Sequence, residues 1–264
     1  MLGKQHISIT IATIFPFLIP MLFSDNSNYF LYFGAIAVAS LVGSLTPDAD
    51  CGGKSKLYYD FKIVYDIMQP LQKFVIFTFK QLNIKYNLNL EYEVNNEHRG
   101  IMHAPIGILI SSLVLTIIAF FITLIFFKES IFIVSLIVFV GLLTGQFLHL
   151  LEDSCTVAGI NWKFPFGTKK LNGNIYTFGK LEGKRDIQPA VYEYILLSIS
   201  FILLIGYAFE IINYVLSIIY ALISLAIILI WVLIIYLSNT KFEFWYQDIE
   251  KIKRIKKVTR NFGK

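Results

Sequence analysis

Residues 104–127, APIGILISSLVLTIIAFFITLIFF, and residues 131–151, IFIVSLIVFVGLLTGQFLHLL, decide the fold class of this chain. Each run is long enough to cross a hydrocarbon core, which takes about 20 residues of helix. Lys128 and Glu129 stand between them and mark a turn. Backbone polar groups find no partner in lipid, and a helix satisfies them within one segment. The two runs therefore predict a pair of membrane-spanning helices.

Four further apolar runs, at residues 7–23, 29–45, 190–209 and 214–237, bring the predicted number of spans to six. The first run contains Pro16 and Pro20 and has the length of a signal-peptide core, but no small-x-small cleavage pattern follows it. We therefore expect a retained helix. The composition agrees, because only 16% of the residues are charged, whereas soluble domains have about 25%. The predicted fold is all-α, a polytopic helical bundle over residues 1–238.

Two long polar segments and a basic tail, residues 239–264, complete the chain. In residues 51–97, apolar side chains recur every three or four positions, with lysines and aspartates between them. They are Phe61, Val64, Tyr65, Met68, Leu71, Phe74 and Val75. This spacing predicts an amphipathic helix that lies on the membrane surface. Residues 154–189 are rich in Gly, Asn and Lys and favour loops or short strands.

The basic residues indicate how the chain is oriented. With six spans, 22 of the 23 Lys and Arg residues fall on one membrane face, and only Lys128 falls on the other. The positive-inside rule then places that face, together with both termini, on the cytoplasmic side of the cell (inner) membrane. The net charge of +5 therefore reports topology. We see no basic and aromatic pattern typical of nucleic-acid binding.

The four histidines of the chain share this cytoplasmic face. Helices predicted to begin or end there carry His6, His98, His103 and His149, and Asp48 and Asp50 follow the second span. These side chains lie close enough to converge if the helices form a bundle. Ionisable groups at the edge of an apolar bundle are unfavourable unless they are paired, hydrated or bound to metal. The pattern favours a divalent-metal site, because imidazole and carboxylate groups suit zinc and similar ions.

The acidic residues divide into two groups. Asp153 follows His149 by four positions, so both lie on one helical face and can hold a metal, or form a simple hydrogen-bonded pair. Glu152 points elsewhere, and we expect it to take no part. Asp48 and Asp50 should alternate in an extended chain after Pro47, as ligands or merely as a helix-stop sequence. Either carboxylate could orient a metal-bound water or accept its proton.

Residues 98–103, HRGIMH, place an arginine between two candidate ligands. Arg99 offers a planar set of donors that suits phosphate or carboxylate. The alternative is a basic anchor at the start of the third span.

These residues, in this order, resemble the YdjM-like family of putative membrane-bound metal-dependent hydrolases. The matching positions are His6, Pro47, Asp48, Ala49, Asp50, His98, Arg99, Gly100, His103, Ala104, Gly145, His149, Asp153, Thr156, Gly159, Trp162, Pro165 and Phe166. The order of ligands is also similar to that of zinc-dependent phospholipase C, which implies phosphoester hydrolysis. Those enzymes have further histidines downstream, whereas this chain has none after His149. We therefore expect one or two ions, zinc first and manganese or another divalent ion as the alternative.

The combined hypothesis is a membrane hydrolase that cleaves a phosphoester of a lipid or amphiphile with water activated by metal. The expected metal ligands are His6, Asp48, Asp50, His98, His103, His149 and Asp153. The expected catalytic residues are Asp48, Asp50, Asp153 and Arg99, and Arg99 also binds substrate. Membrane lipid is the expected partner. The alternatives are an ester or amide hydrolase, and a metal-binding scaffold or transporter. Transport is disfavoured because the spans carry almost no ionisable groups near mid-membrane.

Overall fold

The computed structural model describes residues 3–24, 28–51, 61–86, 94, 99–126, 131–167, 169–176, 187–212 and 216–244. Within them, six long helices are apolar enough to cross a membrane, as predicted. They are α1 (Gly3–Leu22), α2 (Asn28–Leu45), α5 (Pro105–Phe126), α6 (Ile131–Ser154), α7 (Gln188–Ala208) and α8 (Leu216–Leu237). Their outer surfaces are apolar, with side chains such as Phe121 and Phe132 more than half exposed, as expected for helices that face lipid.

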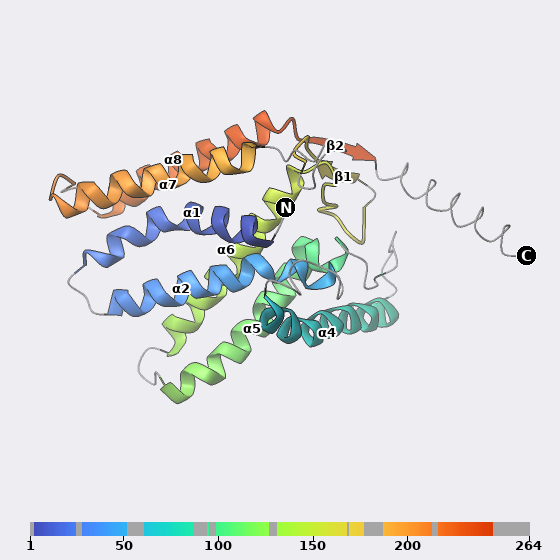
Figure 1. Ribbon diagram of the computed structural model, residues 1–264. Helices are drawn as coiled ribbons and strands as arrows, with labels where there is room; N and C mark the ends of the chain where they lie inside the picture. Colours follow the sequence, from blue (N-terminus) through green and yellow to red (C-terminus); the bar gives the residue numbers. More distant parts are fainter. Residues whose placement is uncertain are drawn as a thin grey trace, which may run out of the picture.

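Helix α6 lies at the centre of one half of the bundle, between α2 and α5, while α1 joins α2 to α7 and α8 (Figure 1). Small residues allow α2 and α6 to approach closely. A Cβ atom on Gly43 would collide with the carbonyl group of Leu142, and one on Gly145 would collide with the carbonyl group of Ser40. This close contact fixes the position of the C-terminal end of α6, along the helix axis, relative to the C-terminal end of α2.

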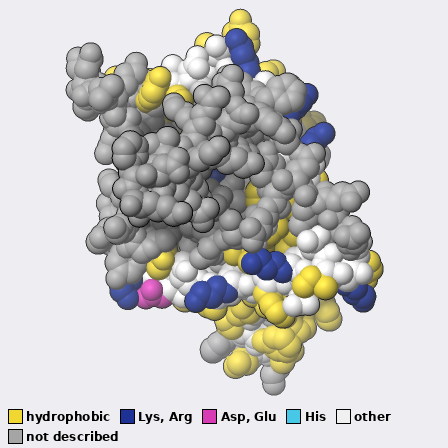
Figure 2. Space-filling view, turned by 90° about the vertical axis from the view of Figure 1, so that its right-hand side faces the viewer, with side chains coloured by type: hydrophobic (Ala, Val, Ile, Leu, Met, Phe, Trp, Pro, Cys, Tyr) yellow, Lys and Arg dark blue, Asp and Glu magenta, His cyan; other side chains and the backbone are white. Residues whose placement is uncertain are grey.

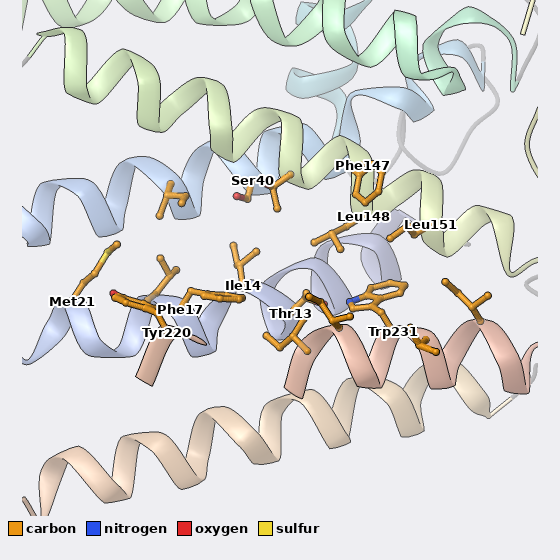
Figure 3. Close-up of a pocket in the computed structure, with 17 residues that line it drawn as sticks. Thr13, Ile14, Phe17, Met21, Ser40, Phe147, Leu148, Leu151, Tyr220 and Trp231 are labelled. Carbon is orange, nitrogen blue, oxygen red and sulfur yellow. The ribbon is translucent and has the colours of Figure 1, made fainter. Parts of the chain in front are cut away.

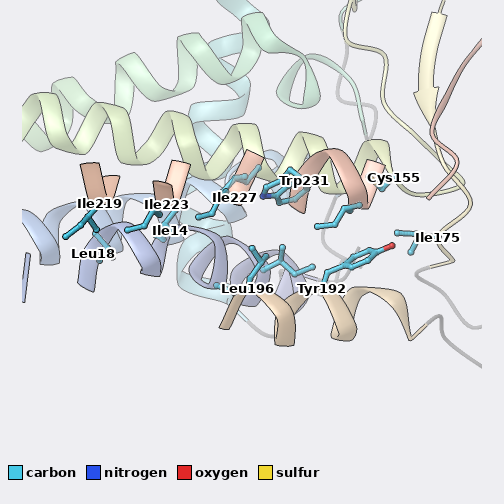
Figure 4. Close-up of a cluster of buried hydrophobic side chains, with 14 residues drawn as sticks. Ile14, Leu18, Cys155, Ile175, Tyr192, Leu196, Ile219, Ile223, Ile227 and Trp231 are labelled. Atoms are coloured by element: carbon cyan, nitrogen blue, oxygen red, sulfur yellow. The ribbon is translucent and has the colours of Figure 1, made fainter. Parts of the chain in front are cut away.

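A cluster of buried apolar side chains joins α1, α7 and α8 on the other side of the bundle. Ile14, Leu196, Ile223 and Trp231 lie within it, and Tyr192 lies at its end (Figure 4). The cluster continues to Leu148 on α6. It therefore holds the outer pair of helices, α7 and α8, against the helices that carry the candidate site.

The remaining elements gather at one end of the bundle, which we call the site end. They are the 3₁₀ helices η1 (Pro47–Cys51) and η2 (Ile101–His103), helix α4 (Lys62–Tyr86), and strands β1 (Lys169–Asn172) and β2 (Lys241–Phe244). The two strands form an antiparallel pair in which Lys169 is opposite Phe244. Seen from this end, lysine or arginine side chains lie around the margin of the described surface, next to a hydrophobic area (Figure 2).

Helix α4 is amphipathic as predicted, and several side chains of its predicted apolar face pack against protein, while Ile63, Ile67 and Phe77 remain exposed. Met68, Leu71 and Val75 are buried in a cluster with Ile101 and Met102. Tyr65 is buried as well, against Leu45. Among the predicted positions that are described, Phe74 is half exposed. The spacing identified a helix with a buried face, and that face packs against the apolar side chains of Ala49 in η1 and of Ile101 and Met102 in η2.

Candidate metal centre

Four chain segments bring the predicted residues together at the site end. His6 begins α1, Asp48 and Asp50 lie in η1, His103 lies in η2, and His149 and Asp153 end α6. The three histidines are fully buried, and the acidic residues are at least nine-tenths buried. His98, the fourth predicted histidine, lies outside the described residues.

The chain around Asp48 and Asp50 is helical, so the prediction of an extended chain there is wrong. Proline is favourable in the first turn of a helix and acidic residues stabilise that turn, so Pro47 starts a new 3₁₀ helix directly after α2. With three residues per turn, side chains two positions apart point about 120° apart. The two aspartates therefore approach different atoms of His103. Asp48 Oδ1 lies 3.7 Å from Nε2, and Asp50 Oδ2 lies 2.9 Å from Nδ1.

An oxygen atom holds the Nδ1 atom of each described histidine. The pairs are His6 with Glu152 Oε2 at 2.7 Å, His103 with Asp50 Oδ2 at 2.9 Å, and His149 with the Ser44 carbonyl at 2.6 Å. The Ser44 carbonyl only accepts hydrogen bonds, so Nδ1 of His149 is the donor there, and Nδ1 is likewise the donor to a carboxylate wherever that carboxylate is ionised. Such contacts are typical of metal-binding histidines, because they fix the ring and leave the Nε2 atom for the ion.

The Nε2 atoms face the carboxylates of Asp48 and Asp153. His149 Nε2 lies 3.6 Å from Asp48 Oδ1 and 4.0 Å from Asp153 Oδ2, and His6 Nε2 lies 3.5 Å from Asp153 Oδ1. Among the described residues, Nε2 of His6 and Nε2 of His149 are buried without a hydrogen-bond partner. A buried polar atom with no partner is destabilising, and a bound cation would remove that penalty.

The donor atoms have the spacing that a metal ion needs. Two overlapping groups, His6 with His149 and Asp153, and Asp48 with His103 and His149, each have all ligand atoms within 4.8 Å of one another. Ligand atoms on a tetrahedral zinc ion are about 3.3 Å apart, so the site needs only a small contraction. Both groups use His149 Nε2, which has one lone pair and can bind one ion. The residues therefore fit a single shared ion best.

Arg99 forms an ion pair with Asp153. Its Nη2 atom lies 3.0 Å from Asp153 Oδ2, and its Nη1 atom donates to the Gly159 carbonyl at 3.0 Å. Its backbone N–H donates to Asp50 Oδ2 at 3.1 Å, and its φ of 63° is in the left-handed region, where non-glycine residues are uncommon. The backbone is thus turned so that one residue contacts both acidic groups. Nη1 and Nη2 of Arg99 are thus engaged within the protein, whereas its buried Nε has no hydrogen-bond partner among the described residues.

Glu152 is a residue of the centre that sequence reasoning missed. It was expected to take no part, yet it is almost fully buried and accepts the hydrogen bond of His6. A signal was present in the sequence. A glutamate in the last turn of a membrane span is unfavourable unless it has a partner, and His6 was the candidate at the same depth on another span.

Charge around His103 sets its protonation. Burial alone would lower its pKa, but the negative charge of Asp50 and hydrogen bonds to Asp48 and Asp50 outweigh it and raise the pKa of His103 to about 9. Without metal, this imidazole is therefore protonated at neutral pH.

Access from solvent to the metal centre is narrow. The side chains of Asp48 and Arg99 are 11% and 12% exposed, whereas those of the histidines and of Asp153 are at most 1% exposed.

Comparison with curated proteins and with solved structures gave no match. One family model does match, over residues 1–242, and it spans all six membrane helices together with every described residue of the metal centre. By this match the chain belongs to the YdjM inner membrane protein family.

Proposed function

We propose that this chain is a metal-dependent hydrolase of the inner membrane that cleaves a phosphoester of a lipid or amphiphile. One observation carries the proposal. Three buried imidazoles have Nδ1 held by an acceptor and turn Nε2 toward two aspartates. A structural hydrogen-bond network would pair both nitrogens of a buried histidine. Among the described residues, however, Nε2 of His6 and Nε2 of His149 have no hydrogen-bond partner, and a metal centre needs such an available nitrogen.

The ligand set supports a single divalent ion, zinc before manganese. His149 is its central ligand, with Asp48 and His103 on one side and His6 and Asp153 on the other. When bound, such an ion polarises a phosphoryl oxygen and lowers the pKa of water toward neutrality. Asp50 and Glu152 hold His103 and His6 in place, as the hydrogen-bonded carboxylates behind metal ligands commonly do.

The proposed catalytic roles follow from exposure and contacts. Asp48 is the most exposed acidic side chain of the centre, so its carboxylate is the group that can orient water and accept its proton. Arg99 holds Asp153 through Nη2, while its buried Nε has no hydrogen-bond partner among the described residues. That N–H is the donor we assign to a substrate phosphate oxygen. Arg99 would then position Asp153 and bind substrate with different nitrogens.

The position of the centre supports a membrane-bound substrate. It lies at the ends of α1, α2 and α6, where lipid headgroups meet water. The distribution of basic residues supports a cytoplasmic orientation of this end. A lipid could therefore present its headgroup to Asp48 and Arg99 from the cytoplasmic leaflet.

The test measures metal content and turnover together. Purified protein is analysed for bound metal and assayed on a panel of phosphoesters, carboxylic esters and amides, beside Asp153→Asn, Asp48→Asn and Arg99→Lys. Asp66→Asn is the matched control, because Asp66 is exposed and paired with Lys62 away from the centre. We expect about one ion per chain, turnover of phosphoesters, and loss of turnover in the Asp48 and Asp153 variants but not in Asp66→Asn.

The arginine variant separates the substrate classes. Lysine keeps the charge of Arg99 but not its set of planar donors, so Arg99→Lys should reduce phosphoester turnover more than ester turnover. Bound metal without turnover on the whole panel would instead favour a metal-stabilised scaffold. An absence of bound metal after incubation with zinc or manganese would overturn the proposal.

A further inference from the structure

A second site, away from the metal centre, is formed by an elongated apolar pocket between α1, α2, α6 and α8 (Figure 3). Its volume of about 580 Å³ is typical of ligand pockets. On α6 its walls are Thr144, Phe147, Leu148 and Leu151, which repeat every three or four residues and so lie on one face. His149 is on another face of α6 and contacts α2. The pocket is thus separate from the metal centre.

The shape of the pocket follows the direction of the helices. Its lining extends along α1 from Thr13 to Met21, about 12 Å at 1.5 Å per residue, and along α8 from Tyr220 to Ile235, about 22 Å. A long, narrow, apolar space that runs along membrane-spanning helices matches an extended hydrocarbon chain. It matches a compact water-soluble molecule poorly.

Two polar groups that line this pocket find no hydrogen-bond partner in the described parts of the chain. The hydroxyl of Ser40 and the indole N–H of Trp231 are buried without a hydrogen bond among the described residues. Both side chains line the pocket, and the indole nitrogen is turned toward its interior. Ser40 is fully buried and Trp231 is 93% buried, since its exposed fraction is 7%. Unpaired donors at this depth are unfavourable, and they call for a ligand that brings an acceptor.

A second groove provides the comparison. It lies between α2, α5 and α6, has a volume of about 660 Å³, and is also apolar. Its one hydroxyl side chain, that of Thr123, donates to the Phe120 carbonyl. No lining residue of this groove leaves a buried polar atom unpaired among those that the structure describes. Lipid that merely surrounds the protein would fill both grooves alike, so the two unpaired donors distinguish the first pocket.

We propose that the pocket between α1, α2, α6 and α8 binds one ester-linked acyl chain of a membrane phospholipid. The hydrocarbon chain fills the apolar length, and ester carbonyl oxygens accept hydrogen bonds from Ser40 and Trp231. The ligand also fills the space between α8 and α6. This binding does not depend on turnover at the metal centre, so the two proposals can fail separately.

The experiment uses full-length protein in phosphatidylcholine vesicles that contain phosphatidylglycerol with a photoreactive diazirine in one acyl chain. After illumination, mass spectrometry locates the label. We expect labelling of the pocket residues to saturate as the probe fraction rises, and labelling of the α2–α5–α6 groove to rise in proportion to it. Ile228→Trp should fill the pocket, because Ile228 lines it and is 59% exposed. Val38→Trp, at a 61% exposed position of the other groove, is the matched control.

Competition tests the hydrogen bonds. Unlabelled diester phosphatidylglycerol should compete about 30-fold better than its diether analogue, which lacks the carbonyl oxygens, as expected for the loss of the two hydrogen bonds from Ser40 and Trp231. Trp231→Phe and Ser40→Ala should each reduce that preference. Metal content should not change in Ile228→Trp. Equal competition by the two lipids would overturn the ester assignment. Proportional labelling of both grooves, insensitive to Ile228→Trp, would identify surrounding lipid only and overturn the site.

Discussion

Two buried polar clusters lie only three residues apart on α6, and they are satisfied in different ways. Around Gln146, the Ser111 hydroxyl donates to Oε1 at 2.6 Å and Nε2 donates to the Ser112 hydroxyl at 2.9 Å. Around His149, Nδ1 donates to the Ser44 carbonyl, but Nε2 has no hydrogen-bond partner in the described part of the chain. Both side chains are fully buried, so burial alone does not separate a structural cluster from a functional one.

The difference lies in whether the cluster is complete without a ligand. Hydrogen bonds between Gln146 and two serines of α5 join two helices in a region without water, which is a common way to fix helix packing in membranes. His6 and His149 instead each keep one ring nitrogen without a hydrogen-bond partner among the described residues. Incomplete pairing of buried groups is expected where a ligand binds. The predictions below test this distinction.

The largest expected effect is the loss of metal on substitution of His149. His149→Gln keeps much of the side-chain volume but removes the Nε2 atom shared by both ligand groups. Metal content should fall from about one ion per chain to background. Gln146→Leu, three positions away, should retain metal. Metal analysis after size-exclusion chromatography, which confirms that both variants are folded, measures the contrast. Metal loss in both variants would show that the two clusters are one structural unit.

Glu152 should be the next in order of effect. Glu152→Gln removes the carboxylate that orients His6, and loss of such a supporting group commonly lowers metal affinity by about 10- to 100-fold. Asp50→Asn should act similarly through His103. Glu193→Gln is the control. Glu193 accepts a hydrogen bond from the Ser8 hydroxyl, and this hydrogen bond does not involve a histidine. Zinc affinity from competition with a chelator is the readout. Unchanged affinity in both supporting variants would refute this role.

The effect of pH follows from His103, whose pKa is raised to about 9 by the neighbouring aspartates. The imidazole must lose its proton to bind metal. Below about pH 9, each unit of acidification should therefore weaken zinc binding about tenfold, and above that value the dependence on His103 should level off. Calorimetry in two buffers of different ionisation enthalpy should detect about one released proton. Zinc binding with no proton release would contradict the assignment of His103 as a ligand.

The number of spans and the shared face of the histidines could be predicted from sequence, because both depend on regular properties. Apolar runs report the spans, and helix direction alternates from one span to the next. Thus His6 and His149, 143 positions apart in the chain, were expected at one end, and their rings stack with centroids 3.7 Å apart.

Other details could not be predicted because they depend on local backbone geometry. The turn of η1 decides that Asp48 approaches Nε2 of His103 while Asp50 approaches Nδ1, and an extended chain would have placed both on one side. Similarly, the left-handed backbone at Arg99 directs its side chain to Asp153. Hydrophobic spacing showed that α4 has a buried face, but spacing is the same whether protein or lipid covers that face.

The smallest expected effect concerns Gln146 itself. Gln146→Leu removes two hydrogen bonds to α5, and interhelical hydrogen bonds in membranes contribute on average about 0.6 kcal/mol each. Once Gln146 is removed, the single hydroxyl hydrogen of Ser111 can turn to the Ile108 carbonyl of its own helix, 3.1 Å away. The hydroxyl therefore keeps a partner, and the loss should be about 1 kcal/mol. Unfolding in mixed detergent micelles should therefore shift slightly while zinc affinity stays the same. This result would show that the two clusters have different roles. The Gln146 cluster would hold α6 against α5, and the His149 cluster would bind an ion.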